Sequence, residues 1–201
     1  MNIGIDLDGV LFDSEAMFRS YSQIFDILNY GGGMINSEEL KVQNRYGWVK
    51  ELTEKFINET AIEYHQTASV MPFAKQVINA IKKHNKVFVI TSRGLVHKKE
   101  VETTEKRLLA ENFEFDNIIY SVENKLDACR ELDIDIMIDD LYEHVDLLSE
   151  NGIKCFYYRD MVLKFFNKEN VVEVRNWGDI AAELLKLKVI TIEDLKCAFE
   201  K

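Results

Sequence analysis

Two aspartates separated by one residue follow the first apolar run of the chain. That run, Asn2 to Asp6, ends in the string Asp6-Leu7-Asp8-Gly9. Two carboxylates at this spacing raise each other's pKa unless something neutralises them, and a divalent cation would do so. Similar strings occur in turns and in calcium loops. An EF-hand loop, however, needs further oxygen ligands, a closing Glu and a preceding helix, whereas a strand is expected before Asp6.

Two hydroxyls and an arginine follow a second apolar run. Lys86 to Thr91 leads into Thr91-Ser92-Arg93, and we expect a helix to begin near Leu95. Hydroxyl and main-chain N–H groups at the start of a helix could hold phosphate oxygens. The alternative is that Thr91 or Ser92 only caps that helix.

A second pair of acids, Asp139 and Asp140, follows the run Asp135 to Asp139. One of them could cap a helix starting at Leu141, but a pair is more than capping needs, and the sequence offers no obvious ion-pair partner. Lys125 precedes this run. Without context a lysine is usually a solvated surface residue.

The elements that must position these residues alternate between strands and helices. Continuous apolar runs predict buried parallel strands at residues 2–6, 86–91, 117–120, 135–139, 153–158 and 171–174. Helical spacing lies between them, as in Ala74, Val77, Ile78 and Ile81. We therefore expect an α/β fold with a doubly wound, parallel, Rossmann-like sheet, whose ligands sit at the carboxyl ends of the strands.

One stretch interrupts this alternation. Residues 14–71 show helical periodicity around Gly31-Gly32-Gly33, many aromatic side chains and no convincing strand. We predict a small helical cap inserted after the first strand, with residues 1–13 and 72–201 forming the core. Two final helices are expected at residues 178–186 and 191–199, with Thr191 and Asp194 as a capping pair.

Composition narrows the possible partners and the compartment. The chain has 201 residues and a formal charge of -10, which repels polymeric nucleic acid and acidic membranes but leaves small phosphorylated metabolites as partners. Three scattered cysteines form no metal-binding pattern. No signal-like segment or apolar run of the ~20 residues that span a bilayer is present, so the expected location is the cytoplasm.

Taken together, the motifs resemble the haloacid dehalogenase (HAD) superfamily. The resemblance extends from Asn2 to about Tyr158 and rests on Asp6-Leu7-Asp8-Gly9-Val10-Leu11, Thr91, Lys125 and Asp139-Asp140 in this order. It implies that Asp6 is a nucleophile that becomes an aspartyl phosphate and that Asp8 is the general acid and base. Asp8 also favours phosphoryl transfer, because the dehalogenase branch lacks this second acid.

The same resemblance assigns the other residues. Thr91 and Lys125 would hold the phosphoryl oxygens, and we add Ser92 and Arg93 as candidate phosphate-binding residues. The predicted magnesium ligands are Asp6, Asp8 through its main-chain carbonyl, Asp139 and Asp140, with Asp140 favoured over Asp139 as the direct ligand. The chemistry is consistent, because a carboxylate that approaches a phosphate dianion needs its charge neutralised.

The short cap and the Ile-Asp-Asp ending are most similar to the 5′(3′)-deoxyribonucleotidases and cytosolic type C 5′-nucleotidases. A magnesium-dependent phosphomonoesterase that hydrolyses nucleoside monophosphates is therefore expected. Phe12 and Trp48 could stack on a base or could fill the interior of the cap. The alternatives are a sugar-phosphate phosphatase, a phosphomutase and, more distantly, a phospho-accepting receiver-like module. The four histidines are expected on helix surfaces: His65, His84, His97 and His144.

Overall fold

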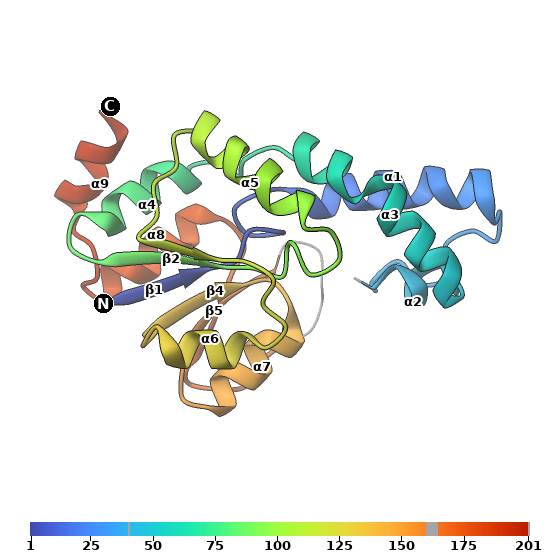
Figure 1. The fold of residues 1–201 in the computed structure, drawn as a ribbon. Helices are drawn as coiled ribbons and strands as arrows, with labels where there is room; N and C mark the ends of the chain where they lie inside the picture. The colour runs from blue at the N-terminus through green and yellow to red at the C-terminus, as the bar shows by residue number, and fades with distance from the viewer. Residues whose placement is uncertain (40, 160–164, 201) are drawn as a thin grey trace.

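A computed structural model describes residues 1–39, 41–159 and 165–200. Its centre is an all-parallel sheet with the strand order β3-β2-β1-β4-β5-β6 (Figure 1). The strands are β1 (Asn2–Ile5), β2 (Lys86–Ile90), β3 (Asn117–Ile119), β4 (Ile136–Asp139), β5 (Lys154–Tyr158) and β6 (Val171–Val174). The predicted α/β class and doubly wound parallel sheet are confirmed.

Helices connect and cover these strands. Those before β2 are α1 (Ser14–Asn29), α2 (Val42–Tyr46), α3 (Lys50–Thr67) and α4 (Ala74–Lys82). Those after it are α5 (Lys99–Ala110), α6 (Lys125–Glu131), α7 (Tyr142–Glu150), α8 (Trp177–Lys186) and α9 (Ile192–Phe199). In the described part of the chain no helix is both long and apolar enough to cross a membrane.

The sheet buries both faces, which explains its continuous apolar runs. In β4, Ile136 and Ile138 pack into a cluster that includes residues of α4 and α8, while Met137 packs into a cluster with residues of α6 and α7. Successive side chains of a strand point to opposite faces, so a strand covered on both sides must be apolar throughout. Figure 1 shows α6 and α7 on the face opposite α4 and α5.

Helices α1, α2 and α3 share a separate hydrophobic cluster. It contains Phe25, Tyr46, Trp48, Phe56 and Tyr64, and these helices extend away from the sheet in Figure 1. Since α1 begins shortly after β1 and α3 ends shortly before α4, this helical layer adjoins the carboxyl end of β1. The boundaries that we predict for the cap, residues 14–71, stay a prediction.

Two local predictions have different outcomes. Thr191 and Asp194 form a complete capping box at the start of α9, as expected. The helix after β2 was expected near Leu95 but begins at Lys99, because the chain first makes a turn in which Gly94 has a φ of 93°. That left-handed conformation suits glycine and interrupts a helix.

Candidate active site

The carboxyl ends of β1 and β4 bring distant acids together. Asp6 follows β1 and its N–H donates to the carbonyl of Ile138 at 3.0 Å, so it extends the pairing of the two strands. Asp139 is the last residue of β4. Side chains that end neighbouring parallel strands gather at one sheet edge, which is where ligands bind in such folds.

Lys125 joins the two acids. Its Nζ lies 2.7 Å from Asp6 Oδ2 and 2.6 Å from Asp139 Oδ2, and all three side chains are buried. The lysine is the first residue of α6, whose N-cap Asn124 accepts a hydrogen bond from the N–H of Leu126. Asp139 therefore has an ion-pair partner, contrary to the sequence-based interpretation, because the lysine 14 residues earlier folds back onto it.

The two acids that contact Lys125 have pKa values shifted in opposite directions. Burial, which outweighs the nearby charge of Lys125, raises the pKa of Asp6 to about 6. Burial also acts to raise the pKa of Asp139, but Lys125 and then His144 hold it below its ordinary value. Although burial opposes it, Asp139 and Asp6 keep the pKa of Lys125 above its ordinary value, so the lysine stays protonated.

Asp140 lies at the same edge without a partner. Among the described residues none donates a hydrogen bond to its carboxylate or forms an ion pair with it. Burial, followed by the charges of Asp6 and Asp139, raises its pKa well above the ordinary value. An unpartnered carboxylate crowded by two others is the arrangement that a hard divalent cation stabilises, so these residues fit magnesium.

The described residues hold one group of candidate metal ligands whose donor atoms lie close together. Asp6, Asp139 and His144 each place one donor atom within 4.8 Å of the others. Both oxygens of Asp139 are already engaged, however: Oδ2 by Lys125, and Oδ1 by the N–H of Leu141 at 3.0 Å and by His144 Nδ1 at 3.2 Å. Because no described residue engages either oxygen of Asp140, the prediction that Asp140 rather than Asp139 is the direct ligand beside Asp6 stays our preferred one.

Magnesium binding should strengthen as the pH rises. Asp6, with a pKa of about 6, carries a proton at about pH 5 that the cation must displace, whereas at about pH 7 it is mostly ionised. We expect an affinity at least about tenfold weaker at the lower pH. Calorimetric titration at the two pH values measures this, and equal affinities would contradict it.

Gly9 provides space for Asp140. Its φ is 71°, and a Cβ at this position would overlap the Asp140 carboxylate. Gly9→Ala should therefore displace Asp140 and abolish measurable magnesium binding. The variant should also lose about 1 kcal/mol of unfolding free energy, because alanine disfavours the left-handed conformation.

Gly152→Ala is the matched control, because Gly152 has a φ of 83° and no atom within 4 Å of an added Cβ. Calorimetry should find normal magnesium binding for this variant. If Gly9→Ala bound magnesium as well as Gly152→Ala does, the close packing of Gly9 on Asp140 would have no functional role.

Asp8 is held by Arg93. The guanidinium binds both carboxylate oxygens, with Nε 2.8 Å from Oδ2 and Nη2 2.6 Å from Oδ1, and its Nη1 donates to Thr104 at 3.1 Å. Arg93 is buried and lies over the ring of Phe12. Burial acts to raise the pKa of Asp8, but Arg93 and then His65 lower it below the ordinary range. The suggestion that Arg93 binds phosphate stays a prediction, and any such contact would compete with Asp8.

Two histidines and a glutamate near these acids were not anticipated. His65, on α3, lies 3.6 Å from Asp8 Oδ1 and 3.4 Å from Glu100 Oε1, while His144 contacts Asp139. Glu100 also accepts from the N–H of Gly94 at 2.9 Å. The expectation that all four histidines lie on helix surfaces was therefore wrong for His65 and His144. It was also wrong for His84 and His97, which lie in no helix. The contact of His65 with Asp8 spans 57 residues of chain, so the spacing of the histidines could not have revealed it.

Thr91 and Ser92 have different surroundings. Thr91 is fully buried and its hydroxyl accepts from the N–H of Arg93 at 3.3 Å, while Ser92 is exposed. The alternative that either residue caps the following helix is wrong, since α5 has no side-chain cap. No described contact joins either hydroxyl to Asp6 or Lys125. Their predicted phosphate-binding roles stay predictions.

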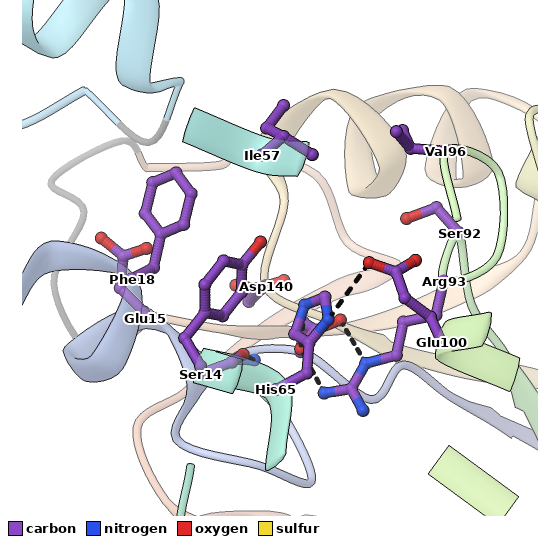
Figure 2. Close-up of a pocket in the computed structure, with 13 residues that line it drawn as sticks. Ser14, Glu15, Phe18, Ile57, His65, Ser92, Arg93, Val96, Glu100 and Asp140 are labelled. Atoms are coloured by element: carbon purple, nitrogen blue, oxygen red, sulfur yellow. Dashed lines mark hydrogen bonds and ion pairs between the residues drawn. The ribbon is translucent and has the colours of Figure 1, made fainter. Parts of the chain in front are cut away.

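A cavity of about 310 Å³ opens beside these residues. Its walls combine charged and apolar side chains: Asp8, Gly9, Ser14, Glu15, Phe18, Ile57, Tyr64, His65, Ser92, Arg93, Val96, Glu100 and Asp140 (Figure 2). Phe12 and Trp48 are absent from these walls. Both are buried, and Trp48 donates to Asp26 at 2.8 Å. The idea that they stack on a base is therefore wrong, and Phe18 and Tyr64 are the aromatic side chains at the cavity.

The chain was compared with known proteins, and no protein-family model matches it. A nucleotidase of Clostridium acetobutylicum is 22% identical over 192 residues, which are 90% of this chain and 91% of that protein. A Bacillus subtilis protein provisionally named a nucleotidase is 21% identical over 179 residues, 88% of this chain and 90% of that protein.

Solved structures resemble the whole fold. A haloacid dehalogenase-like hydrolase from Streptococcus pneumoniae has a TM-score of 0.61 at 15% identity, covering 90% of this chain and 97% of its own. A Bacteroides vulgatus protein provisionally named a β-phosphoglucomutase has a TM-score of 0.61 at 17% identity. The match covers 100% of this chain and 90% of that protein. CbbY from Rhodobacter sphaeroides, solved with xylulose 1,5-bisphosphate, has a TM-score of 0.59 at 15% identity. The match covers 95% of this chain and 99% of that protein. The chain thus has the haloacid dehalogenase-like fold that its motifs predicted.

Proposed function

We propose that this chain is a magnesium-dependent phosphomonoesterase that forms an aspartyl phosphate on Asp6 and hydrolyses nucleoside monophosphates. The observation that carries the proposal is the contact of one buried lysine with two acids at the sheet edge, at 2.7 Å from Asp6 and 2.6 Å from Asp139. A buried, cation-paired carboxylate beside an open cavity has the environment of an activated nucleophile.

The residues divide the reaction between them. Asp6 Oδ2 attacks phosphorus, and the bond from phosphorus to the leaving oxygen breaks. Asp6 is oriented by Lys125 and by the N–H of Leu7, which donates to its Oδ1 at 2.8 Å. Asp8 would donate a proton to the leaving oxygen and later take one from the water that hydrolyses the aspartyl phosphate. Before it can donate a proton, Asp8 must release its hydrogen bonds to Arg93 and become protonated.

Magnesium, held by Asp6, Asp140 and the Asp8 carbonyl, would supply the positive charge that lets two anions approach each other. Asp139 would act through Lys125, which it holds beside the nucleophile at 2.6 Å. Thr91 and Ser92 would contribute to the binding of phosphoryl oxygens.

The choice of a nucleotide substrate has two supports. The two proteins matched by sequence are both named nucleotidases, one of them provisionally, and each aligns with about nine tenths of this chain. The cavity also offers the ring of Phe18 and the side chains of Ile57 and Val96 as apolar surface for a nucleoside.

A sugar-phosphate phosphatase or a phosphomutase is the second candidate. It is supported by the likeness to the Bacteroides vulgatus protein and to CbbY. Both candidate enzymes would use every residue named above, so only an analysis of the reaction products can distinguish them. Free phosphate from nucleotides supports a nucleotidase, and isomerised sugar phosphate without net phosphate release supports a mutase.

The test is an assay of phosphate release from nucleoside monophosphates, sugar phosphates and 4-nitrophenyl phosphate, with magnesium and with a chelator. We expect hydrolysis that requires magnesium and is fastest for nucleotides. Activity that persists in the chelator would contradict the metal assignment. A preference for sugar phosphates would contradict the proposal that nucleoside monophosphates are the substrates.

We also propose a cytoplasmic location. It is supported by the three cysteines, which are all free thiols in the described structure, as a reducing compartment would keep them.

A further inference from the structure

One end of the cavity is not used by the proposed chemistry. Glu15 and Phe18 lie there, while Ser92, Val96 and Glu100 lie at the other end (Figure 2). We infer that Glu15 recognises the unreactive part of the substrate by accepting a hydrogen bond from it, and that this part carries no second anionic group. The inference rests on the proposed function and specifies its substrate.

Glu15 has one oxygen engaged and one free. Arg45 Nη2 donates a hydrogen bond to Oε1 at 2.8 Å, and Arg19 Nε forms an ion pair with the same oxygen at 2.6 Å. Among the described residues no donor reaches Oε2. The side chain is 18% exposed on the cavity wall, so a bound molecule can reach it. Oε2 is therefore a charged acceptor available to an N–H or O–H group of a ligand.

The same contacts hold Glu15 in place before any ligand binds. Arg45 is fully buried, its Nε donates to the carbonyl of Glu39 at 2.8 Å, and its guanidinium lies over the ring of Phe18. Arg19 donates to the carbonyl of Ser37 at 2.7 Å. Because these partners already fix the carboxylate, little further conformational entropy of the Glu15 side chain is lost when a ligand bonds to Oε2.

Among the described residues that line the cavity, none offers a free cation for a second anion. Of its described lining residues, Arg93 already binds Asp8 and Thr104 through all three nitrogens. His65 lies between Asp8 and Glu100. The remaining charged groups are acids, so a second phosphate or a carboxylate would meet repulsion without compensation.

The substrate class follows from these features. Phe18, Ile57, Tyr64 and Val96 give the cavity an apolar surface, and Glu15 requires a donor. A phosphomonoester of a neutral alcohol that carries both a flat ring and N–H or O–H groups fits, as a nucleoside does. Bisphosphates and phosphorylated acids do not.

Glu15→Gln tests the acceptor. The two arginines would hold the amide oxygen of the glutamine, so its NH₂ group would take the place of Oε2. An NH₂ group only donates hydrogen bonds, so it could not accept one from the substrate. We expect kcat/KM for a deoxynucleoside 5′-monophosphate to fall at least about tenfold more than kcat/KM for 4-nitrophenyl phosphate, which has no donor for Glu15. Glu51→Gln, at an exposed position of α3, is the matched control and should match wild type on both substrates.

The outcomes separate recognition from a structural role. Equal losses on the two substrates, together with a lowered Tm, would mean that Glu15 only stabilises α1 and α2, and would overturn the inference. No loss on either substrate would also overturn it.

A substrate pair tests the charge requirement. Wild type should hydrolyse a deoxynucleoside 5′-monophosphate with a kcat/KM at least about tenfold higher than that of the corresponding 3′,5′-bisphosphate, and Glu15→Gln should narrow this ratio. Equal use of the two by wild type would overturn the inference while leaving the phosphomonoesterase intact. If wild type released phosphate from none of these esters, including 4-nitrophenyl phosphate, the proposed function itself would fail.

Discussion

Asp6→Asn should reduce phosphate release by roughly 10⁴-fold while the protein remains folded. Asparagine keeps the shape of the side chain and the oxygen that accepts from the N–H of Leu7. It cannot attack phosphorus as an anion. Because burial raises the pKa of Asp6 to about 6, removing this acid also relieves a crowded site, so the Tm without magnesium should be unchanged or higher.

Asp133→Asn is the matched control for this variant. Asp133 is exposed and has a φ of 47°, which asparagine tolerates well. Steady-state phosphate release should match wild type. If Asp6→Asn kept more than about one tenth of the wild-type rate, Asp6 would not be the phosphate acceptor.

Lys125→Met should cost about 3–5 kcal/mol of unfolding free energy in the presence of a chelator. The lysine is buried between Asp6 and Asp139, so its loss leaves two buried carboxylates without their shared cation. Magnesium should recover part of this stability, because it supplies positive charge at the same place. We therefore expect magnesium to raise the Tm of the variant more than it raises the Tm of wild type.

Denaturant unfolding with and without magnesium measures both effects. Lys99→Met, an exposed lysine on α5, should leave the unfolding free energy within about 0.5 kcal/mol of wild type. The same Tm shift on adding magnesium to both Lys125→Met and wild type would show that the cation and the lysine act on different acids.

The sequence predicted the fold, and the sheet edge at which the acids lie, for a physical reason. Strands that are buried on both faces must be apolar, so β1, β2 and β4 were visible as continuous runs, and each run leads to a polar residue: Asp6, Thr91 and Asp139. The parallel topology then brings the ends of β1 and β4 to one edge. The nearness of Asp6 and Asp139 follows from these local patterns, whereas the ion pair of Lys125 with Asp139 was not expected from the sequence.

The rest of the site depends on contacts that no local pattern encodes. Arg93 binds Asp8 across 85 residues of chain, and His65 reaches Asp8 from α3. Phe18 and Tyr64 line the cavity, whereas Trp48, an equally suitable aromatic residue by composition, is buried against Asp26. Which aromatic side chains face the cavity depends on how α1, α2 and α3 pack.

The most direct measurement is mass spectrometry of the protein quenched in acid during turnover of a deoxynucleoside monophosphate with magnesium. A covalent acceptor predicts the mass of one phosphoryl group on the tryptic peptide 1–19, located at Asp6, removed by hydroxylamine and absent in Asp6→Asn. Rapid phosphate release with no such adduct at any quench time, or with the adduct on another residue, would contradict the central claim.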